Sequence, residues 1–189
     1  MKKYWHHTRI DYDGTQLSSL FAYKSFNVQG DSIVAFRGKC DVTIDEMVDI
    51  ADVKDKAFIQ SKDMLHFIVE QFVIDLEKAV FHQRLLTTIV KEALELEFSE
   101  RSEVQRVIRS GDDLFIMNRK LSVSIATLSP VSSLIHFGIN VSSEGTPVPT
   151  CGLRDLQIEP EQFAKRVLDE YTSEIEGIYL ARCKVRGVK

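Results

Sequence analysis

Residues 111–141, GDDLFIMNRKLSVSIATLSPVSSLIHFGINV, constrain the fold of this chain more than any other stretch. They predict a strand, a two-residue turn at Asn118-Arg119, a second strand, a serine-rich loop and a third strand. Asparagine tolerates positive φ, which suits a tight hairpin turn. A turn at this point fixes which residues oppose each other across the hairpin. The expected pairs are Met117 with Lys120, Phe115 with Ser122, and Asp113 with Ser124.

The hairpin and the third strand should present two different faces, because side chains alternate along a strand. The apolar face, a surface for the core, would hold Leu114, Ile116, Leu121, Val123, Ile125, Ile135, Phe137, Ile139 and Val141. The other face would hold Asp113, Lys120, Ser122, Ser124, His136, Gly138 and Asn140. Small residues leave room for a ligand against the backbone, so this second face predicts a binding surface. A solvated sheet face is the alternative interpretation.

Composition limits the class of protein. The chain has 189 residues, 44% hydrophobic and 28% charged, which is typical of one soluble domain, here residues 1–189. Its net charge of −4 argues against nucleic acid as the main partner. We expect no membrane span and no secretory signal, because no apolar run has the required length. The cysteines, Cys40, Cys151 and Cys183, form no CxxC pair. They predict reduced thiols in a cytoplasmic protein, with no metal centre, zinc or haem held by the protein.

A second candidate site lies at Arg37-Gly38-Lys39, between two short β-rich runs of residues 32–44. A glycine at the first central position suits a type II′ hairpin turn. Two cations beside a flexible glycine can bind phosphate or carboxylate groups through side chains and backbone N–H groups. A solvated turn is the alternative interpretation.

Helical spacing of apolar residues begins after residue 61. Predicted helical runs contain Met64, Leu65, Ile68, Phe72 and Leu76, then residues 85–94, and finally residues 161–178 behind Pro160. We expect His66 and His82, on or beside the first two runs, to lie at the edge of the core. The order of hairpin, helices, strands and closing helix predicts an α+β fold, with a mixed or antiparallel sheet backed by helices on one face.

Two segments resemble biotin protein ligases. DDLFIMNRKLSVSIAT is similar to their signature, in which Asn-Asp precedes a strand, a short turn and a Lys-Leu-Ala-Gly run. SLIHFGINVSSEGTPV is similar to their Gly-x-Gly-Ile-Asn-Val strand. Lipoate ligases have a comparable lysine-bearing hairpin, and the whole chain resembles a small, functionally uncharacterised branch of this superfamily. The resemblance implies the biotin/lipoate ligase catalytic-domain fold, which is related to class II aminoacyl-tRNA synthetases.

The resemblance also implies roles for individual residues. Lys120 matches the lysine that contacts the carboxylate and the α-phosphate during acyl-adenylate formation, where a fixed cation offsets developing charge. Asp113 matches the aspartate of Asn-Asp, and Asp112 stands at the asparagine. Implied substrate or nucleotide contacts are Ser122, Ser124, His136, Gly138, Asn140, and Arg37, Gly38 and Lys39 at the place of the glycine-rich nucleotide loop. That loop is reduced here to one Arg, one Gly and one Lys.

Three functions follow from these residues. The first is ATP-dependent activation of a small carboxylic acid as its adenylate, with Mg²⁺, and transfer to a protein or amine acceptor. The second is a non-catalytic binding module that keeps the fold and the pocket, which the reduced loop favours. The third is acyl transfer without ATP. Acyltransferases of this kind use a cysteine nucleophile, and the candidate here is Cys151. An exposed edge strand could also support a homodimer.

Overall fold

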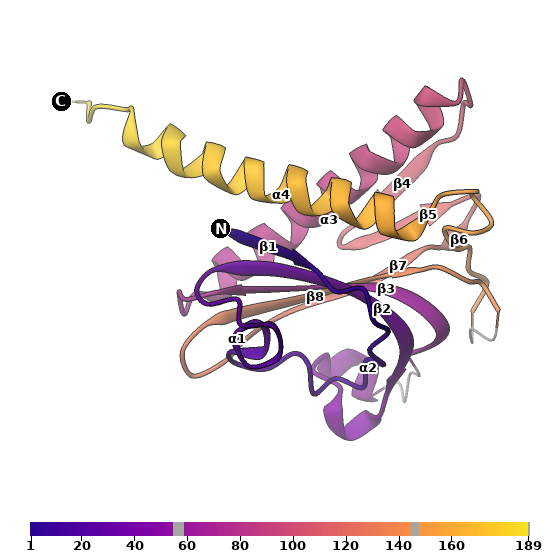
Figure 1. Cartoon of the computed structure of the whole chain (residues 1–189), viewed down its shortest axis with the longest axis horizontal. Helices are drawn as coiled ribbons and strands as arrows, with labels where there is room; N and C mark the ends of the chain where they lie inside the picture. Colours follow the sequence, from indigo (N-terminus) through magenta and orange to yellow (C-terminus); the bar gives the residue numbers. More distant parts are fainter. Residues whose placement is uncertain (55–58, 145–147, 189) are drawn as a thin grey trace.

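The computed structural model describes residues 1–54, 59–144 and 148–188. Its strands form two sheets (Figure 1). A five-stranded sheet has the order β1-β2-β3-β8-β7, with β1 parallel to β2 and the other pairs antiparallel. A three-stranded antiparallel sheet has the order β4-β5-β6. The bounds are Lys2–Trp5 (β1), Ser32–Val42 (β2), Ile59–Gln71 (β3), Val107–Ser110 (β4), Asp113–Ile116 (β5), Arg119–Lys120 (β6), Ser122–Leu128 (β7) and Ser133–Asn140 (β8).

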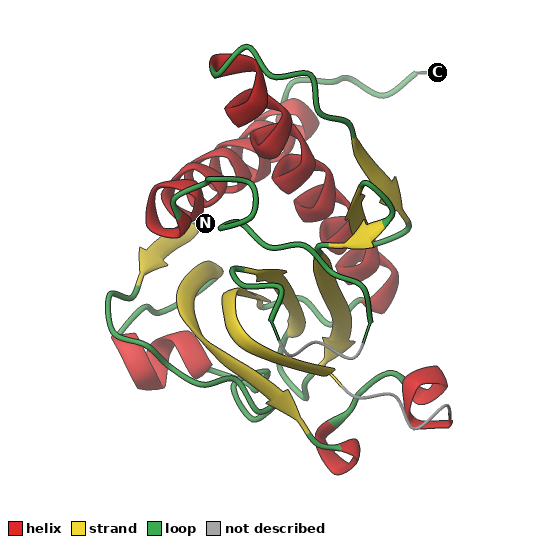
Figure 2. Ribbon diagram, turned by 90° about the vertical axis from the view of Figure 1, so that its right-hand side faces the viewer, coloured by secondary structure: helices red, strands yellow, loops and turns green. Residues whose placement is uncertain are grey.

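Two long helices, α3 (Leu76–Glu100) and α4 (Pro160–Cys183), cover one face of the large sheet (Figures 1 and 2). Each begins at a side-chain cap. Asp75 accepts a hydrogen bond from the backbone N–H of Lys78, and Glu159 accepts one from that of Gln162, with Pro160 in the first turn. Three short elements, α1 (Phe21–Phe26), η1 (Ile44–Glu46) and α2 (Ile50–Lys54), lie toward the other face. The predicted α+β fold with a mixed sheet backed by helices is confirmed.

Both faces of the large sheet are partly buried. The helix-side core contains Phe67, Leu86, Phe137, Phe163 and Tyr171, all wholly buried. A smaller cluster on the opposite face contains Tyr12, Val34, Phe36, Met64 and Ile68. This second cluster is the floor on which the pocket described below is built.

The helix predicted to begin at residue 61 is wrong, because residues 59–71 form strand β3. β3 lies between β2 and β8 at the centre of the sheet, and every residue from Asp63 to Gln71 is buried. Leu65 and Phe67 enter the helix-side core, whereas Met64 and Ile68 enter the opposite cluster. A strand buried on both faces reads as a continuous apolar run, in which a helical spacing can be found by chance. The second and third predicted helices correspond to α3 and α4.

The turn predicted at Gly38 is also wrong, because β2 runs through it and pairs with β3 on both sides. Residues 10–12 run beside this part of β2 and parallel to it, and the N–H of Ile10 donates to the carbonyl of Arg37 and that of Tyr12 to the carbonyl of Lys39. A Cβ at Gly38 would lie 1.8 Å from the carbonyl oxygen of Ile10. Glycine is therefore required here for close backbone approach, and not for a turn.

The hairpin turn lies one residue earlier than predicted. Met117 and Asn118 have φ of 49° and 59°, as a type I′ turn requires. Phe115 consequently pairs with Lys120, and Ile116 with Arg119. The register differs from the expected one by two residues, so Asp113 and Lys120 still share a face.

The second strand of the hairpin divides between the two sheets. Lys120 pairs in the small sheet, whereas the chain from Ser122 onward pairs with β8 in the large one. Leu121 and Ser122 are both wholly buried, so the alternation of faces breaks between them. Val123 and Ile125 therefore line the pocket, contrary to the prediction, and Val123 packs on the cluster opposite the helices.

Strand β8 follows its predicted alternation. Its core side chains belong to the helix-side core and its other side chains face the opposite cluster, with His136 and Asn140 lining the pocket. The core side chains are Ile135, Phe137 and Ile139, followed by Val141.

Candidate functional site

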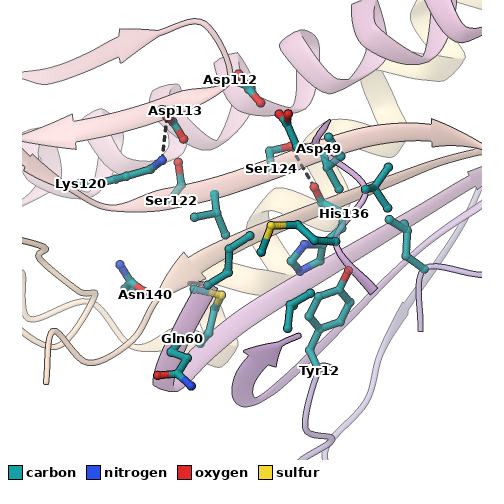
Figure 3. Close-up of a pocket in the computed structure, with 18 of the residues that line it drawn as sticks. Tyr12, Asp49, Gln60, Asp112, Asp113, Lys120, Ser122, Ser124, His136 and Asn140 are labelled. Atoms are coloured by element: carbon teal, nitrogen blue, oxygen red, sulfur yellow. Dashed lines mark hydrogen bonds and ion pairs between the residues drawn. The ribbon is translucent and has the colours of Figure 1, made fainter. Parts of the chain in front are cut away.

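A cavity of about 380 Å³ opens on the sheet face opposite the long helices (Figure 3). Its walls come from β3, β7, β8, the small sheet, the N-terminal segment and residues 42–49. Nine of the described wall residues are apolar: Leu17, Val42, Met47, Val48, Ile59, Met64, Val123, Ile125 and Val148. The polar ones include seven that the sequence predicted: Asp112, Asp113, Lys120, Ser122, Ser124, His136 and Asn140. An apolar enclosure with a few polar groups is the usual form of a small-molecule site.

Lys120 and Asp113 form an ion pair at one end of this pocket, with 2.8 Å between Nζ and Oδ2. Both side chains are about one-third exposed, at 32% and 29%, so a ligand can reach them. Burial raises the pKa of the Asp113 carboxyl, and the hydrogen bond and charge of Lys120 only partly oppose that effect. The ion pair therefore has a fixed position and remains accessible from the pocket.

Helix α3 fixes the neighbouring carboxylate. The amide of Gln83 donates to Asp112 Oδ2 at 2.8 Å and to Ser124 Oγ at 3.0 Å. Arg84 Nη1 lies 3.2 Å from Asp112 Oδ1. Ser124 Oγ donates to the carbonyl of His136, so its hydroxyl is already engaged. The sequence analysis does not identify Gln83 and Arg84. Gln83 lies among the buried residues of α3, and a polar residue in such a position indicates a specific hydrogen-bonding role.

Ser122 likewise has a structural partner, since its Oγ accepts a hydrogen bond from the N–H of Leu114 at 2.9 Å. This bond ties the small sheet to the large one. Gly138 does not line the cavity. A Cβ there would lie 2.5 Å from Met64 Sδ and 3.2 Å from Val123, so this glycine lets two wall residues pack on the sheet.

A stack of rings forms the other end of the pocket. The rings of Tyr12 and His136 are parallel, with centroids 3.9 Å apart, and His66 Nδ1 lies 3.1 Å from His136 Nε2. Burial lowers the pKa of His66 to about 3 and that of His136 well below its usual value, so both imidazoles are neutral. The sequence does not predict Tyr12 here, because only the pairing of residues 10–12 with β2 brings it to the pocket.

Two polar groups aim into the cavity without partners. Tyr12 and Asn140 are only 3% and 4% exposed. Within residues 1–54, 59–144 and 148–188, neither the Tyr12 hydroxyl nor the Asn140 amide has a hydrogen-bond partner. Both groups lie on the wall of the cavity, so both are suited to contact a ligand.

The neutral histidines predict a pH dependence of stability. Their folded pKa values lie below the unfolded value of about 6.5, so their contribution is complete above that pH and is lost as pH falls toward the folded values. Between pH 7.5 and 5.5 we expect each to remove on the order of 1 kcal/mol from the free energy of unfolding measured in urea. The variant His136→Phe, which keeps a ring against Tyr12, should lose about half of this dependence. Replacing the exposed His7 by alanine should leave it unchanged, and a flat wild-type profile would contradict the assignment.

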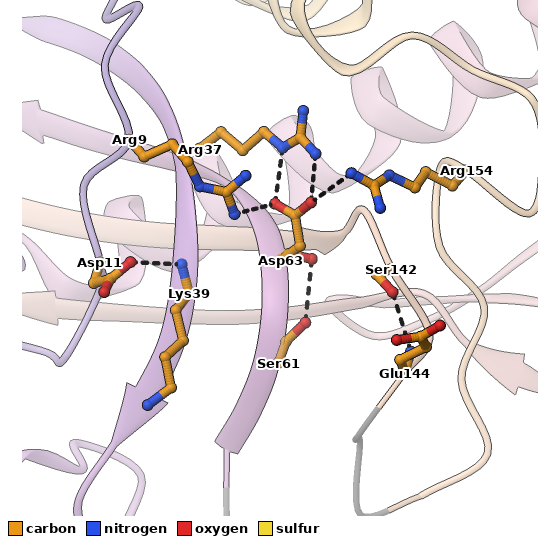
Figure 4. Close-up of polar contacts among 9 residues, drawn as sticks. All are labelled: Arg9, Asp11, Arg37, Lys39, Ser61, Asp63, Ser142, Glu144 and Arg154. Carbon is orange, nitrogen blue, oxygen red and sulfur yellow. Dashed lines mark hydrogen bonds and ion pairs between the residues drawn. The ribbon is translucent and has the colours of Figure 1, made fainter.

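None of the predicted phosphate-binding residues Arg37, Gly38 and Lys39 lines the pocket. Figure 4 shows the polar contacts of Arg37 and Lys39. Arg37 points to the helix-covered face, since it pairs with Leu65 of the core on that face. There it forms a double hydrogen bond with Asp63. Lys39 pairs with Asp41 in solvent. In the described structure, Arg37 and Lys39 therefore do not lie together at the tip of a hairpin, contrary to the prediction.

Asp63 is the centre of this arginine cluster. Its side chain is 8% exposed and also contacts Arg9 at 2.8 Å and Arg154 at 3.3 Å. Burial alone would raise the pKa of Asp63, but the hydrogen bonds and charges of the arginines, led by Arg37, hold it below its ordinary value. One carboxylate thus joins β2, β3, the N-terminal segment and the chain after β8.

Cys151 lies beside Lys120, whose carbonyl accepts a hydrogen bond from the N–H of Cys151 at 3.1 Å. The side chain is wholly buried in the helix-side core, and burial raises the pKa of its thiol to about 11. A protonated thiol in the core is a poor nucleophile. No group of three or more potential metal ligands occurs in the described part of the chain, and no helix there is long and apolar enough to cross a membrane.

Comparison with other proteins identifies relatives without an assigned activity. A family model described as "Domain of unknown function (DUF366)" matches residues 1–186. An uncharacterized protein of Methanocaldococcus jannaschii is 42% identical over 177 residues, covering 90% of this chain and 77% of that protein. A solved structure of a protein of unknown function from Pyrococcus horikoshi has 41% identity and a TM-score of 0.91, and the match covers 100% of both chains.

The structure is also similar to a biotin protein ligase. The Aquifex aeolicus enzyme in complex with biotin and ATP gives a TM-score of 0.56 at 15% identity, covering 93% of this chain and 70% of that one. At this identity the similarity shows the fold alone. It confirms the predicted fold, that of the biotin and lipoate protein ligases, and the predicted position in an uncharacterised branch.

Proposed function

The chain belongs to the DUF366 family, a domain of unknown function, and from this premise we propose that it activates a small carboxylic acid with ATP as an acyl-adenylate. The activated acyl group would then pass to an amine or a protein acceptor. The observation that carries the proposal is the Lys120–Asp113 ion pair at the end of a pocket with a partly apolar wall. A cation at one end and apolar walls beyond it suit an acid whose carboxylate meets Lys120.

Each residue has a chemical task in this proposal. Lys120 offsets the negative charge that develops as the carboxylate attacks the α-phosphate, and Asp113 fixes the direction of the ammonium group. The amide of Asn140, which has no partner in the described structure, is suited to bind a carboxylate or ribose oxygen. The apolar walls around Val123 and Met64 hold the body of the acid.

Mg²⁺ would accompany ATP. Asp112 and Asp113 are adjacent carboxylates on the pocket wall, and both already contact cations, Arg84 and Lys120. A Mg²⁺ ion brought in on phosphates needs only one or two protein carboxylates and keeps several waters, so this pair is sufficient. When bound, the ion neutralises phosphate charge.

A second candidate is a binding module that recognises a carboxylic acid without ATP. Lys120 is the only cation among the described residues that line the pocket, and Arg37 is engaged with Asp63 on the other face of the sheet. These observations favour recognition of one carboxylate over that of a triphosphate. Acyl transfer without ATP is disfavoured, because the thiol of Cys151 is buried and protonated.

Acid-dependent exchange of pyrophosphate into ATP tests the proposal directly. The wild-type protein is assayed with a panel of short- and medium-chain, cyclic and heterocyclic carboxylic acids, with a thermal-shift measurement on the same panel in the presence and absence of Mg²⁺-ATP. Exchange with at least one acid, and stabilisation by ATP, are expected under the proposal. Stabilisation by an acid but not by ATP, without exchange, would replace it with the binding module.

A further inference from the structure

Helix α4 continues past the body of the protein. Its buried side chains end at Tyr171, and only Thr172 and Ile175 remain half-buried beyond that point. In Figure 1 the C-terminal half of the helix, drawn in yellow, extends beyond the sheet and away from the rest of the chain. About three helical turns, as far as Cys183, are therefore held only at one end.

The exposed half keeps the apolar stripe of the buried half. Val167, Tyr171, Ile175 and Ile178 follow one another at steps of four, four and three residues, which places them on one side of the helix. Tyr179 lies beside them, with the guanidinium carbon of Arg182 5.7 Å from the centroid of its ring. Ile178 is 42% exposed and Tyr179 54%. The stripe that packs on the core as far as Tyr171 thus continues into solvent.

Local sequence does not favour this free helical segment. Gly177 lies within it, with nothing within 4 Å of the position its Cβ would take. A glycine in an exposed helix interior costs about 1 kcal/mol relative to alanine, and short helices without tertiary contacts are marginal in water. A partner that covers the stripe would supply the missing contacts.

Charge identifies the kind of partner. The part of the helix nearest the body carries acids, whereas the end and the following residues carry bases. The acids are Asp169, Glu170, Glu174 and Glu176, and the bases are Arg182, Lys184 and Arg186. Burial, and the charges of Glu92 and Asp169, raise the pKa of Glu170 although Arg166 opposes them. This segment is therefore complementary to itself when two copies run in opposite directions.

We propose that α4 pairs antiparallel with α4 of a second copy of the chain, about a two-fold axis near Gly177. Ile175, Ile178 and Tyr179 of both copies form the contact. The basic end of each copy lies beside Glu170 and Glu174 of the other. A two-fold axis makes the contact isologous and closed, so it yields a dimer and no fibre. The pocket opens on the face opposite α4, so the dimer leaves it accessible.

The dimer should depend on concentration, since two crossing helix ends bury less than the roughly 800 Å² per partner of a standard interface. Sedimentation velocity of the full chain from about 5 to about 200 μM covers the range of weak interfaces. We expect reversible dimerisation of the wild type. Ile178→Asp should weaken it at least 10-fold, and Val104→Asp, a change at a fully exposed site before β4, should not. Circular dichroism establishes that both variants are folded.

Charge exchange tests the direction of pairing. Arg182→Glu with Arg186→Glu should weaken the dimer, and adding Glu170→Arg and Glu174→Arg to the same chain should restore it. Cys183 is the exposed cysteine among three free ones, so a nitroxide label can be placed on it selectively. Antiparallel pairing predicts about 20 Å between the two labelled positions, whereas parallel pairing predicts about 10 Å.

A monomer at all concentrations, or a dimer that Ile178→Asp does not affect, would overturn the proposal. Failure of the charge exchange to restore the dimer, or a short label distance, would also overturn it. Because these measurements use neither ATP nor an acid, their outcome is independent of the proposed function.

Discussion

Replacement of Lys120 by alanine is expected to lower acid-dependent ATP–pyrophosphate exchange by at least about 100-fold, the effect of removing one fixed charge from a transition state. Lys120 is the cation of the described pocket wall, and no neighbouring lysine or arginine on that wall can replace it. Removal also leaves Asp113, whose pKa burial already raises, without its ion-pair partner. Exchange rates at saturating and limiting acid would separate the loss of rate from the loss of binding.

Lys165→Ala is the matched control. This lysine is exposed on α4, pairs with Glu161 and does not line the pocket. The control variant should exchange like the wild type. If Lys120→Ala also retained the full exchange rate of an active wild type, Lys120 would have no part in the chemistry and the assignment of the pocket would be wrong.

Replacement of Asp63 by asparagine is expected to lower the free energy of unfolding by about 3 kcal/mol, because it leaves Arg37 partly buried without a counter-charge. The asparagine side chain keeps the shape of the aspartate it replaces, so the loss reports charge and hydrogen bonding. Arg9 and Arg154 are 52% and 62% exposed and should contribute less. Urea unfolding at neutral pH measures the difference.

The pH profile distinguishes this effect from a packing defect. The folded pKa of Asp63 lies below its unfolded value, so its contribution is present above about pH 4 and is lost as pH falls through the folded pKa. The difference between wild type and Asp63→Asn should therefore shrink on acidification. Asp41→Asn, at an exposed carboxylate paired with Lys39, is the control and should have no measurable effect. An equal difference at pH 3 and pH 7 would refute the charge explanation.

The parts of the fold that the sequence predicted are those governed by local alternation on one buried face. Strand β8 is the best example, since Phe137 and Ile139 enter the core and His136 and Asn140 do not. The sequence of β3 predicts a helix, because burial on both faces removes the period of two that marks a strand. At Gly38, a turn and the close approach of another backbone segment both require glycine. The sequence alone therefore does not distinguish between them.

The candidate site was predicted in part for a similar reason. Lys120 and Asp113 were expected to share a face, and they do, because an error of two residues in register preserves the face. Val123 was placed on the wrong face because the chain passes from one sheet to the other at Leu121, which no local pattern records. Tyr12 and Gln83 reach the pocket through contacts distant in sequence, which a single sequence does not reveal.

The pairing of residues 10–12 with β2 has a consequence for the order of folding. Tyr12 acquires its backbone partners only after residues 37–41 are extended, and its stacking partner His136 lies 124 residues further along the chain. Arg9, in the same segment, needs Asp63. Contacts of such large sequence separation form late, because loop closure must precede them. We therefore expect the wall of the pocket to be among the last parts of the native structure to assemble, so that ligand binding would report complete folding.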